Sequence, residues 1–280
     1  MKNKLKLLLP AGLLLFLSGC VSVVDKSGKV IQEKVIHLSD PWKIEGLFDS
    51  FLIWPLSQIV NYISSVTGPT VAIVVVTVIV KLATLPLTVK QQIQSQKMQE
   101  LQPKVQAIQE KYKGRNDSQA QMMAGQEMQA LYQKHDIKMS GMFLPLLIQL
   151  PIILCLYQAV QRAESVVNGS LFGHSLETTP LNGILSGQYF YLLIFVVLLV
   201  SQGASMLLPQ WLSKRKQKLY PGQKPAKQNN TTMYIFVAIF SYFGLVWNTG
   251  MAIYFIISSL CQIASTFYAQ HIVDQQRGKA

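Results

Sequence analysis

The stretch TVAIVVVTVIVKLATLPL, residues Thr70 to Leu87, decides the fold of this protein. A helix of about 20 mostly apolar residues crosses the ~30 Å hydrocarbon core of a bilayer, and this stretch has that character. Its one charged residue is Lys81. A charge at bilayer depth costs about 2.5 to 3.5 kcal/mol on insertion scales, so it usually marks a pathway or a binding site. Alternatively, the long side chain reaches the cytoplasmic interface, roughly 9 Å away along the helix.

The composition of the whole chain agrees with a membrane protein. Of 280 residues, 50% are hydrophobic and only 14% are charged, which is too few charges to cover a soluble protein of this size. The net charge is +12, and the basic residues collect between the apolar segments. The sequence therefore predicts an all-α membrane protein.

Five stretches have the composition of membrane helices, although the fourth is slightly short. They are residues 66–87, 141–160, 188–208, 232–247 and 251–268. Asn248-Thr249-Gly250 is typical of a turn and separates the last two. Lys and Arg are concentrated in 88–140, 209–231 and the tail 269–280, and are sparse or balanced by acids in 20–65 and 161–187. Because cytoplasmic loops carry the excess of Lys and Arg, we expect a multi-pass bacterial cell-membrane protein with its amino terminus outside and its carboxyl terminus in the cytoplasm.

The amino-terminal residues predict an export signal with a lipid attachment site. Three lysines precede an apolar run, and Leu17-Ser18-Gly19-Cys20 resembles a bacterial lipobox. We expect residues 1–19 to be removed and Cys20 to carry a covalent lipid, the only attached group predicted; an ordinary signal with an incidental Cys is the alternative. Cys155 and Cys261 lie in different apolar segments without metal-ligand spacing, so neither a metal site nor a disulfide is expected.

Two polar segments are predicted to be helical. Residues 40–65 favour an extracellular amphipathic helix that begins at Asp40-Pro41 and lies in the interface through its aromatic side chains; an extended linker is the alternative. Residues 88–140 predict a cytoplasmic helical hairpin with a polar turn at residues 114–117. Its two apolar stripes are Val89, Ile93, Leu101, Val105, Ile108 and Tyr112, then Met122, Met128, Leu131 and Tyr132.

The sequence lacks the usual signs of an enzyme or an ion-coupled transporter. Every carboxylate lies outside the five predicted spans, whereas proton- and cation-coupled transporters generally need buried acids. The four histidines lie in loops or at a helix end, so no metal centre or Ser-His pair is expected inside the membrane. No Gly-rich phosphate loop is present, and no specific nucleic-acid partner is expected.

The spans do carry uncharged polar residues. Thr77, Lys81 and Thr84 stand at i, i+4 and i+7 and share one helix face, while Gln149 and Gln202 lie in the second and third spans. Such residues either form hydrogen bonds between membrane helices or line a water-filled cavity.

Three runs of residues resemble the YidC family of membrane protein insertases. They are TVIVKLATLPLT at 77–88, LQPK at 101–104, and LPLLIQLP at 144–151 followed by Leu156-Tyr157. The lipobox and the short extracellular region resemble the Gram-positive branch. The resemblance implies five helices around a hydrophilic groove that is open to the cytoplasm and to lipid. It also implies insertion of client membrane proteins, alone or beside the Sec translocon, without nucleotide hydrolysis.

Some residues depart from the family pattern. Lys81 occupies the groove position where Arg is usual, and a Lys loses its charge more readily on burial. Phe255 stands where many members carry Trp or Tyr, residues 139–142 lack the usual Pro and Cys, and the tail after His271 is short, so strong ribosome docking is not expected.

We therefore expect a substrate-binding groove formed by Lys81, Thr77, Thr84, Gln149, Gln202 and Phe255. In this hypothesis, Lys81 attracts acidic translocated tails of clients, and the partners are those clients, the bilayer, the Sec translocon and, less strongly, a translating ribosome. The rival hypothesis is a lipid-anchored scaffold whose polar face only packs helices. A channel or transporter is a third alternative.

Overall fold

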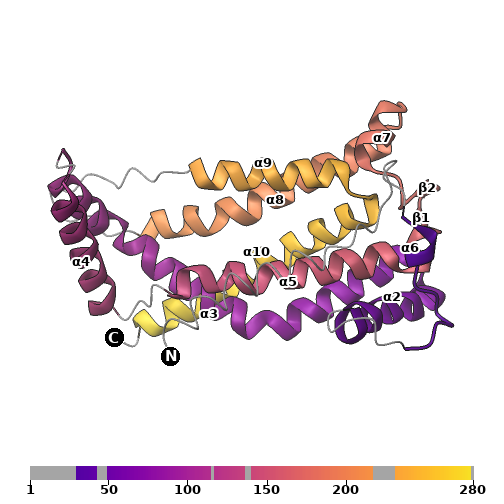
Figure 1. Ribbon diagram of the computed structural model, residues 1–280, viewed down its shortest axis with the longest axis horizontal. Coiled ribbons are helices and arrows are strands. Elements are labelled where there is room, and N and C mark those ends of the chain that lie inside the picture. The colour runs from indigo at the N-terminus through magenta and orange to yellow at the C-terminus, as the bar shows by residue number, and fades with distance from the viewer. Residues whose placement is uncertain (1–29, 43–48, 115–116, 136–139, 217–230, 279–280) are drawn as a thin grey trace. The chain divides into compact units, whose positions relative to one another are not determined.

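The structure is a computed structural model that describes residues 30–42, 49–114, 117–135, 140–216 and 231–278. Its helices are α2 (Trp54–Thr67), α3 (Pro69–Lys111), α4 (Ser118–Lys134), α5 (Ser140–Arg162), α6 (Glu164–Val167), α7 (Pro180–Leu185), α8 (Tyr189–Lys216), α9 (Thr231–Val246) and α10 (Thr249–Gly278). Short helical turns η1 (Gln32–Lys34) and η2 (Asp49–Ile53) and a two-stranded hairpin, β1 (Ser170–Leu171) and β2 (His174–Ser175), complete the description (Figure 1). The predicted signal and Cys20 lie outside the described residues.

The helical content confirms the predicted all-α membrane class. Within the described residues, α3, α8 and α10 are each long and apolar enough to cross a membrane. Helix α9 has a shorter apolar stretch, Val237–Val246, and the side chains of its first turns lie outside the description, as do those at the start of α5. Three of the five predicted spans are thus supported by length and composition.

The chain divides into two compact units. The first contains residues up to Val76, then Gln149–Leu192 and Leu245–Met251; the second contains Thr77–Ile148, Leu193–Gly244 and the rest from Ala252. Each unit has its own packing.

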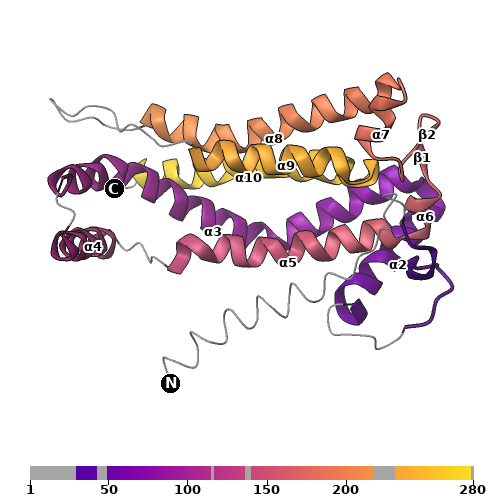
Figure 2. The ribbon, with the colours of Figure 1, turned by 45° about the horizontal axis from the view of Figure 1, so that its top comes forward.

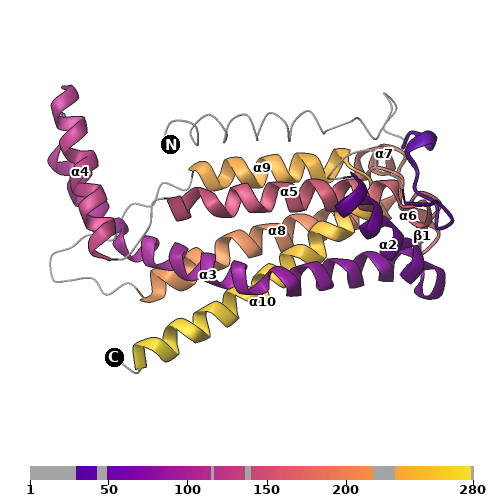
Figure 3. The same cartoon turned by 60° about the horizontal axis from the view of Figure 1, so that its bottom comes forward.

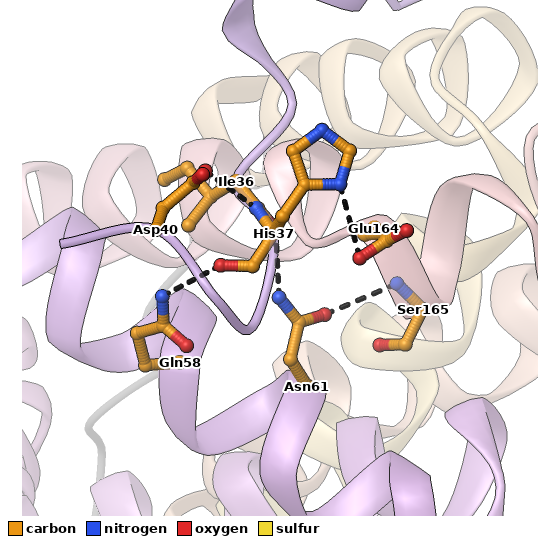
Figure 4. A network of polar contacts seen from close by, with 7 residues as sticks. All are labelled: Ile36, His37, Asp40, Gln58, Asn61, Glu164 and Ser165. Carbon is orange, nitrogen blue, oxygen red and sulfur yellow. Dashed lines mark hydrogen bonds and ion pairs between the residues drawn. The ribbon is translucent and has the colours of Figure 1, made fainter.

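In the first unit, the segment before α2 docks on α2 and on the turn after α5. Ile36 forms a parallel bridge with Ala163, and its carbonyl accepts a hydrogen bond from Asn61 Nδ2 at 2.7 Å. Asn61 Oδ1 accepts from the backbone N–H of Ser165, and His37 Nδ1 lies 3.1 Å from a Glu164 carboxylate oxygen (Figure 4). Because Asn61 is buried and uses both ends of its amide, this network fixes the docked segment. Figures 1, 2 and 3 all show α2, α6 and β1 gathered together.

The same unit holds a mostly buried ion pair. The Arg162 guanidinium, at the end of α5, bonds to the Asp49 carboxylate, and its Nε donates to the Lys34 carbonyl at 2.8 Å. Nearby, the buried Ser57 hydroxyl donates to the carbonyls of Ile53 and Ala159. Arg162 therefore joins three segments that are far apart in the sequence.

The prediction that a helix begins at Asp40-Pro41 is wrong. The Asp40 carboxylate accepts a hydrogen bond from the backbone N–H of His37 at 2.8 Å. It therefore closes a turn with a residue that precedes it in the chain, and it does not cap a helix that follows. Residues 40–42 are not helical, and the described helix begins at Asp49 with η2 and continues as α2. The interfacial position of α2 stays a prediction.

Helix α3 is longer than the predicted first span. It begins at Pro69 because Gly68, with φ at +88°, ends α2, and it continues without a break past Leu87 to Lys111. Pro86 and Pro103 both lie inside it. The first predicted span and the first helix of the predicted hairpin are therefore one helix.

In the second unit, the end of α3 and α4 form the predicted helical hairpin (Figures 1 and 2). Leu101, Val105 and Tyr132 form a buried cluster, against which Met98, Met128 and Leu131 pack. The turn between the helices includes Gly114 at φ +93°, and the Asp117 side chain caps α4 by accepting from the N–H of Ala120. Both apolar stripes therefore contribute to the hairpin contact.

A polar cluster between the end of α3 and the middle of α4 predicts a pH dependence of the hairpin. Glu127 accepts from Lys111 Nζ and from the Tyr112 hydroxyl, which lower the pKa of Glu127, and the bond to Glu127 raises the pKa of Lys111. Because the pKa of Glu127 is lower in the folded protein, ionised Glu127 stabilises the fold above the ordinary pKa of a glutamate, and this stabilisation is lost as the pH falls through the lowered pKa. Because the pKa of Lys111 is raised, the stabilisation from protonated Lys111 is lost as the pH rises through that raised pKa. We expect hydrogen exchange of α4, corrected for intrinsic rates, to quicken slightly on acidification. Glu127→Gln should remove that dependence; an equal acid response in the variant would contradict it.

The turn between α9 and α10 is confirmed. The Asn248 side chain caps α10 by accepting from the N–H of Met251 at 3.0 Å, and Thr249 donates to the Thr178 carbonyl through both its N–H and its hydroxyl. A Cβ on Gly250 would lie 2.9 Å from Val166 Cγ1, so glycine permits the close approach. The break predicted from Asn-Thr-Gly is thus fixed by contacts in the first unit.

Candidate functional site

The candidate site centres on the polar face of α3. Thr77 is buried, and Lys81 and Thr84 are partly buried. The Thr84 hydroxyl donates to the Val80 carbonyl at 2.9 Å, and Thr88 donates in the same way to Thr84 at 3.0 Å. The Thr84 and Thr88 hydroxyl protons are therefore used within the helix, and Lys81 is the charged donor on this face.

Helices α8 and α10 meet through a buried polar pair. Ser259 Oγ of α10 donates to Gln202 Oε1 of α8 at 2.6 Å, and both side chains are at most 9% exposed. Ser201 and Ser205, which flank Gln202, instead donate to carbonyls of their own helix. Gln202, predicted as a groove residue, therefore forms a hydrogen bond between helices.

Phe255 is buried in an aromatic contact. Its ring lies edge-on to Phe240 of α9, with 5.8 Å between centroids and 76° between planes, and it also contacts Tyr254. On α9, a Cβ at Gly244 would lie 2.9 Å from Leu198 of α8, so this glycine allows a close approach of the two helices. Phe255 thus belongs to the packing among α8, α9 and α10.

Helix α10 also faces α3. Lys81 and Cys261 are close enough to interact electrostatically. Cys261 lies two positions after Ser259, a rotation of about 200° at 3.6 residues per turn, so the two side chains leave nearly opposite sides of α10. The hydrogen bond to α8 and the interaction with α3 therefore use different sides of α10.

The predicted site residues fall into two groups. Lys81, Thr77 and Thr84 share a face of α3, whereas Gln202 and Phe255 contact Ser259 and Phe240 on the other side of α10. Gln149 lies in α5, and its side chain is outside the described residues. The sequence reasoning missed the partner roles of Cys261 and Phe240. The sequence holds no specific signal for the first, because Ser258, Ser259 and Gln262 are more polar side chains in the same predicted span.

No metal chemistry is indicated in the part of the chain that the structure describes. It contains no group of three His, Cys, Asp or Glu side chains that could hold a metal ion. Cys155 and Cys261 are free thiols.

The Gln202–Ser259 bond predicts a measurable coupling between α8 and α10. Single changes Gln202→Leu and Ser259→Ala should each destabilise the protein, because each leaves a buried polar partner. A double-mutant cycle from thermal unfolding in detergent should give a coupling of about 0.6 to 1.7 kcal/mol, the range for hydrogen bonds between membrane helices. Ser258→Ala, one residue away, is the control. Strictly additive effects of Gln202→Leu and Ser259→Ala would show that the bond is absent.

Comparison with known proteins gives a consistent picture. Residues 62–276 match the family model described as 60Kd inner membrane protein. The chain is 28% identical over 272 residues to membrane protein insertase MisCA of Bacillus subtilis, covering 95% of this chain and 91% of the relative. It is 27% identical over 272 residues to membrane protein insertase YidC 2 of Streptococcus pneumoniae serotype 4, covering 96% and 87%. It is also 33% identical over 253 residues to membrane protein insertase YidC of Mycoplasma capricolum, covering 85% and 63%.

The family model covers most of the chain, including α3 with Lys81 and the helices that contact it. The chain therefore belongs to the 60Kd inner membrane protein family, the family of the YidC and MisCA membrane protein insertases.

Proposed function

We propose that this protein inserts client membrane proteins into the bacterial cell membrane and helps them fold. The observation that carries this function is a single cation, Lys81, within the apolar stretch Thr70–Leu87 of α3, in a chain of the insertase family. Five membrane helices, α3, α5, α8, α9 and α10, would surround a hydrophilic groove that Lys81 lines. A short polar segment of the client would then cross only part of the hydrocarbon core.

The electrostatic step follows from the position of Lys81. A protonated ammonium attracts a carboxylate 4 Å away by about 4 kcal/mol at an effective dielectric constant of 20. Acidic residues in the translocated tail of a client would therefore enter the groove more readily. Thr77 and Thr84 would help to keep the site hydrated.

The driving force of insertion would come from the client itself. Burial of apolar surface is favourable by roughly 25 cal/mol per Å², so a hydrophobic segment leaves the groove sideways into lipid without nucleotide hydrolysis. In this view, the protein only lowers the barrier for the polar tail.

The topology proposed from the sequence completes this account. Cys20 would carry a lipid outside the cell, α2 would lie in the outer interface, and the α3–α4 hairpin would face the cytoplasm together with the basic loop 209–231. The chain would act alone or beside the Sec translocon, and translating ribosomes are a further proposed partner.

Rescue of bacteria depleted of their own insertase tests this function. Expression of the wild-type chain should restore growth and the membrane insertion of a reporter client with an acidic tail. A chain that reaches the membrane at normal levels but restores neither would refute insertase function. It would favour the scaffold hypothesis instead.

A further inference from the structure

The polar face of α3 does not end at Thr84. It continues through Thr88, Gln92, Gln96 and Gln99 in steps of three or four residues, which keeps all of them on the side of the helix that carries Lys81. From Thr77 to Gln99 this polar face is roughly 33 Å long at ~1.5 Å per residue. The apolar stretch ends at Leu87, so the glutamines extend the polar face beyond the predicted span.

Two of these glutamines are buried and carry amide atoms that have no hydrogen-bond partner among the described residues. Gln92 is 9% exposed and Gln96 is 4% exposed. Among the described residues, neither amide atom of Gln92 has a partner, and the Gln96 Nε2 group has none. The neighbouring Gln91 and Gln94, on other faces of α3, are partly exposed. Buried polar groups in proteins are usually paired, so an unpaired amide needs an explanation such as a ligand or water.

The chemistry of the amide indicates what the ligand is. A Gln side chain offers a donor and an acceptor, as a peptide unit does, and it has no charge with which to select an ion. Gln92 and Gln96 are about 6 Å apart along the helix, and an extended chain repeats the groups on one side every ~6.8 Å. The two amides therefore match the main chain of an extended polypeptide.

We propose that Gln92 and Gln96 bind the main chain of a client's polar segment in extended form, on the cytoplasmic side of Lys81. This binding mode rests on the proposed insertase function. Recognition through peptide groups does not depend on side chains, whereas Lys81 selects acidic ones. Both glutamines are buried in this structure, so the client would displace the protein atoms that cover them and supply the missing hydrogen bonds.

The test uses the full chain in lipid vesicles and three clients with the same hydrophobic segment. The first has an acidic tail, the second has its acids changed to Asn and Gln, and the third has proline at alternate tail positions, which removes backbone N–H donors. Insertion is measured by protection from protease. Gln92→Leu with Gln96→Leu keeps side-chain volume and removes the amides, and Gln94→Leu is the matched control.

We expect Gln92→Leu/Gln96→Leu to lower insertion of the first and second clients about tenfold, roughly threefold for each lost hydrogen bond. The proline client should be affected less, because it lacks N–H donors for Gln92 Oε1 but keeps carbonyls that accept from both Nε2 groups. The thermal midpoint of the variant should stay equal or rise, because unpaired buried amides are removed. Gln94→Leu should match wild type. Lys81→Ala should affect the first client and spare the second.

Normal insertion by the double variant would overturn the binding mode and leave insertase function intact. An equal loss for the proline client, or a loss that follows a lower thermal midpoint, would also overturn it and indicate a packing or water-binding role. Failure of the wild-type chain to insert any client above protein-free vesicles would refute both this binding mode and the proposed function.

Discussion

Lys81→Glu is expected to lower insertion of a client with an acidic tail by at least about tenfold, because an attraction of more than ~1.4 kcal/mol becomes a repulsion. Lys81→Ala should give a smaller loss, since it removes the attraction without adding repulsion. Lys81→Arg should match or exceed wild type, because Arg keeps its charge on burial more firmly. The measurement is the inserted fraction of the client at matched membrane levels of each variant.

The client itself supplies the control for this series. Neutralising its acidic residues should remove most of the difference among the four side chains at position 81. If Lys81→Glu inserts the acidic client as well as wild type does, electrostatic attraction is not the role of Lys81. A lysine whose ammonium only reaches the interface would give that result.

Arg162→Met is expected to produce the largest loss of stability. Arg162 and Asp49 side chains are only 13% and 29% exposed, and removal of the guanidinium leaves a largely desolvated carboxylate and an unpaired Lys34 carbonyl. Breaking a fully buried pair costs 3 to 5 kcal/mol, and we expect about 2 kcal/mol here because Asp49 keeps some contact with water. The thermal midpoint in detergent should fall by roughly 4 to 8 °C.

A second variant separates charge from packing in this prediction. Arg162→Met together with Asp49→Leu removes both charges and should recover part of the lost stability, because no unpaired carboxylate remains. If Arg162→Met leaves the thermal midpoint unchanged, the ion pair does not hold the docked segment. Lys81 variants, which lie in the other unit, should leave this midpoint nearly unchanged.

Much of the fold follows from local sequence patterns. The apolar length of α3, α8 and α10, the Asn-Thr-Gly break before α10 and the two stripes of the hairpin all depend on residues close in sequence. The predicted helix start at Asp40-Pro41 is wrong because an Asp carboxylate can close a turn, here with His37, as readily as it can cap a helix. The continuity of α3 was missed because Pro86 and the change from apolar to polar residues both suggest an end, although neither breaks the helix.

The candidate site was predictable only in part. The i, i+4, i+7 rule places Thr77, Lys81 and Thr84 on one face, since it concerns a single helix. Which polar residue meets which across helices depends on how the helices rotate and approach. Gln202 therefore proved to bond Ser259, and Phe255 to contact Phe240, as no spacing in the sequence indicates. Burial of Gln92 and Gln96 was equally hidden, because a Gln-rich helix is usually solvated.

Insertion by the purified chain in lipid vesicles tests the central claim most directly. The wild-type protein, without nucleotide or other proteins, should bring a client with a short acidic tail into a protease-protected position well above the level in empty vesicles. The Lys81→Glu variant should lose most of that activity for this client and keep it for the neutral-tail client. Equal protection in empty vesicles and in vesicles with the wild-type chain would contradict insertase function.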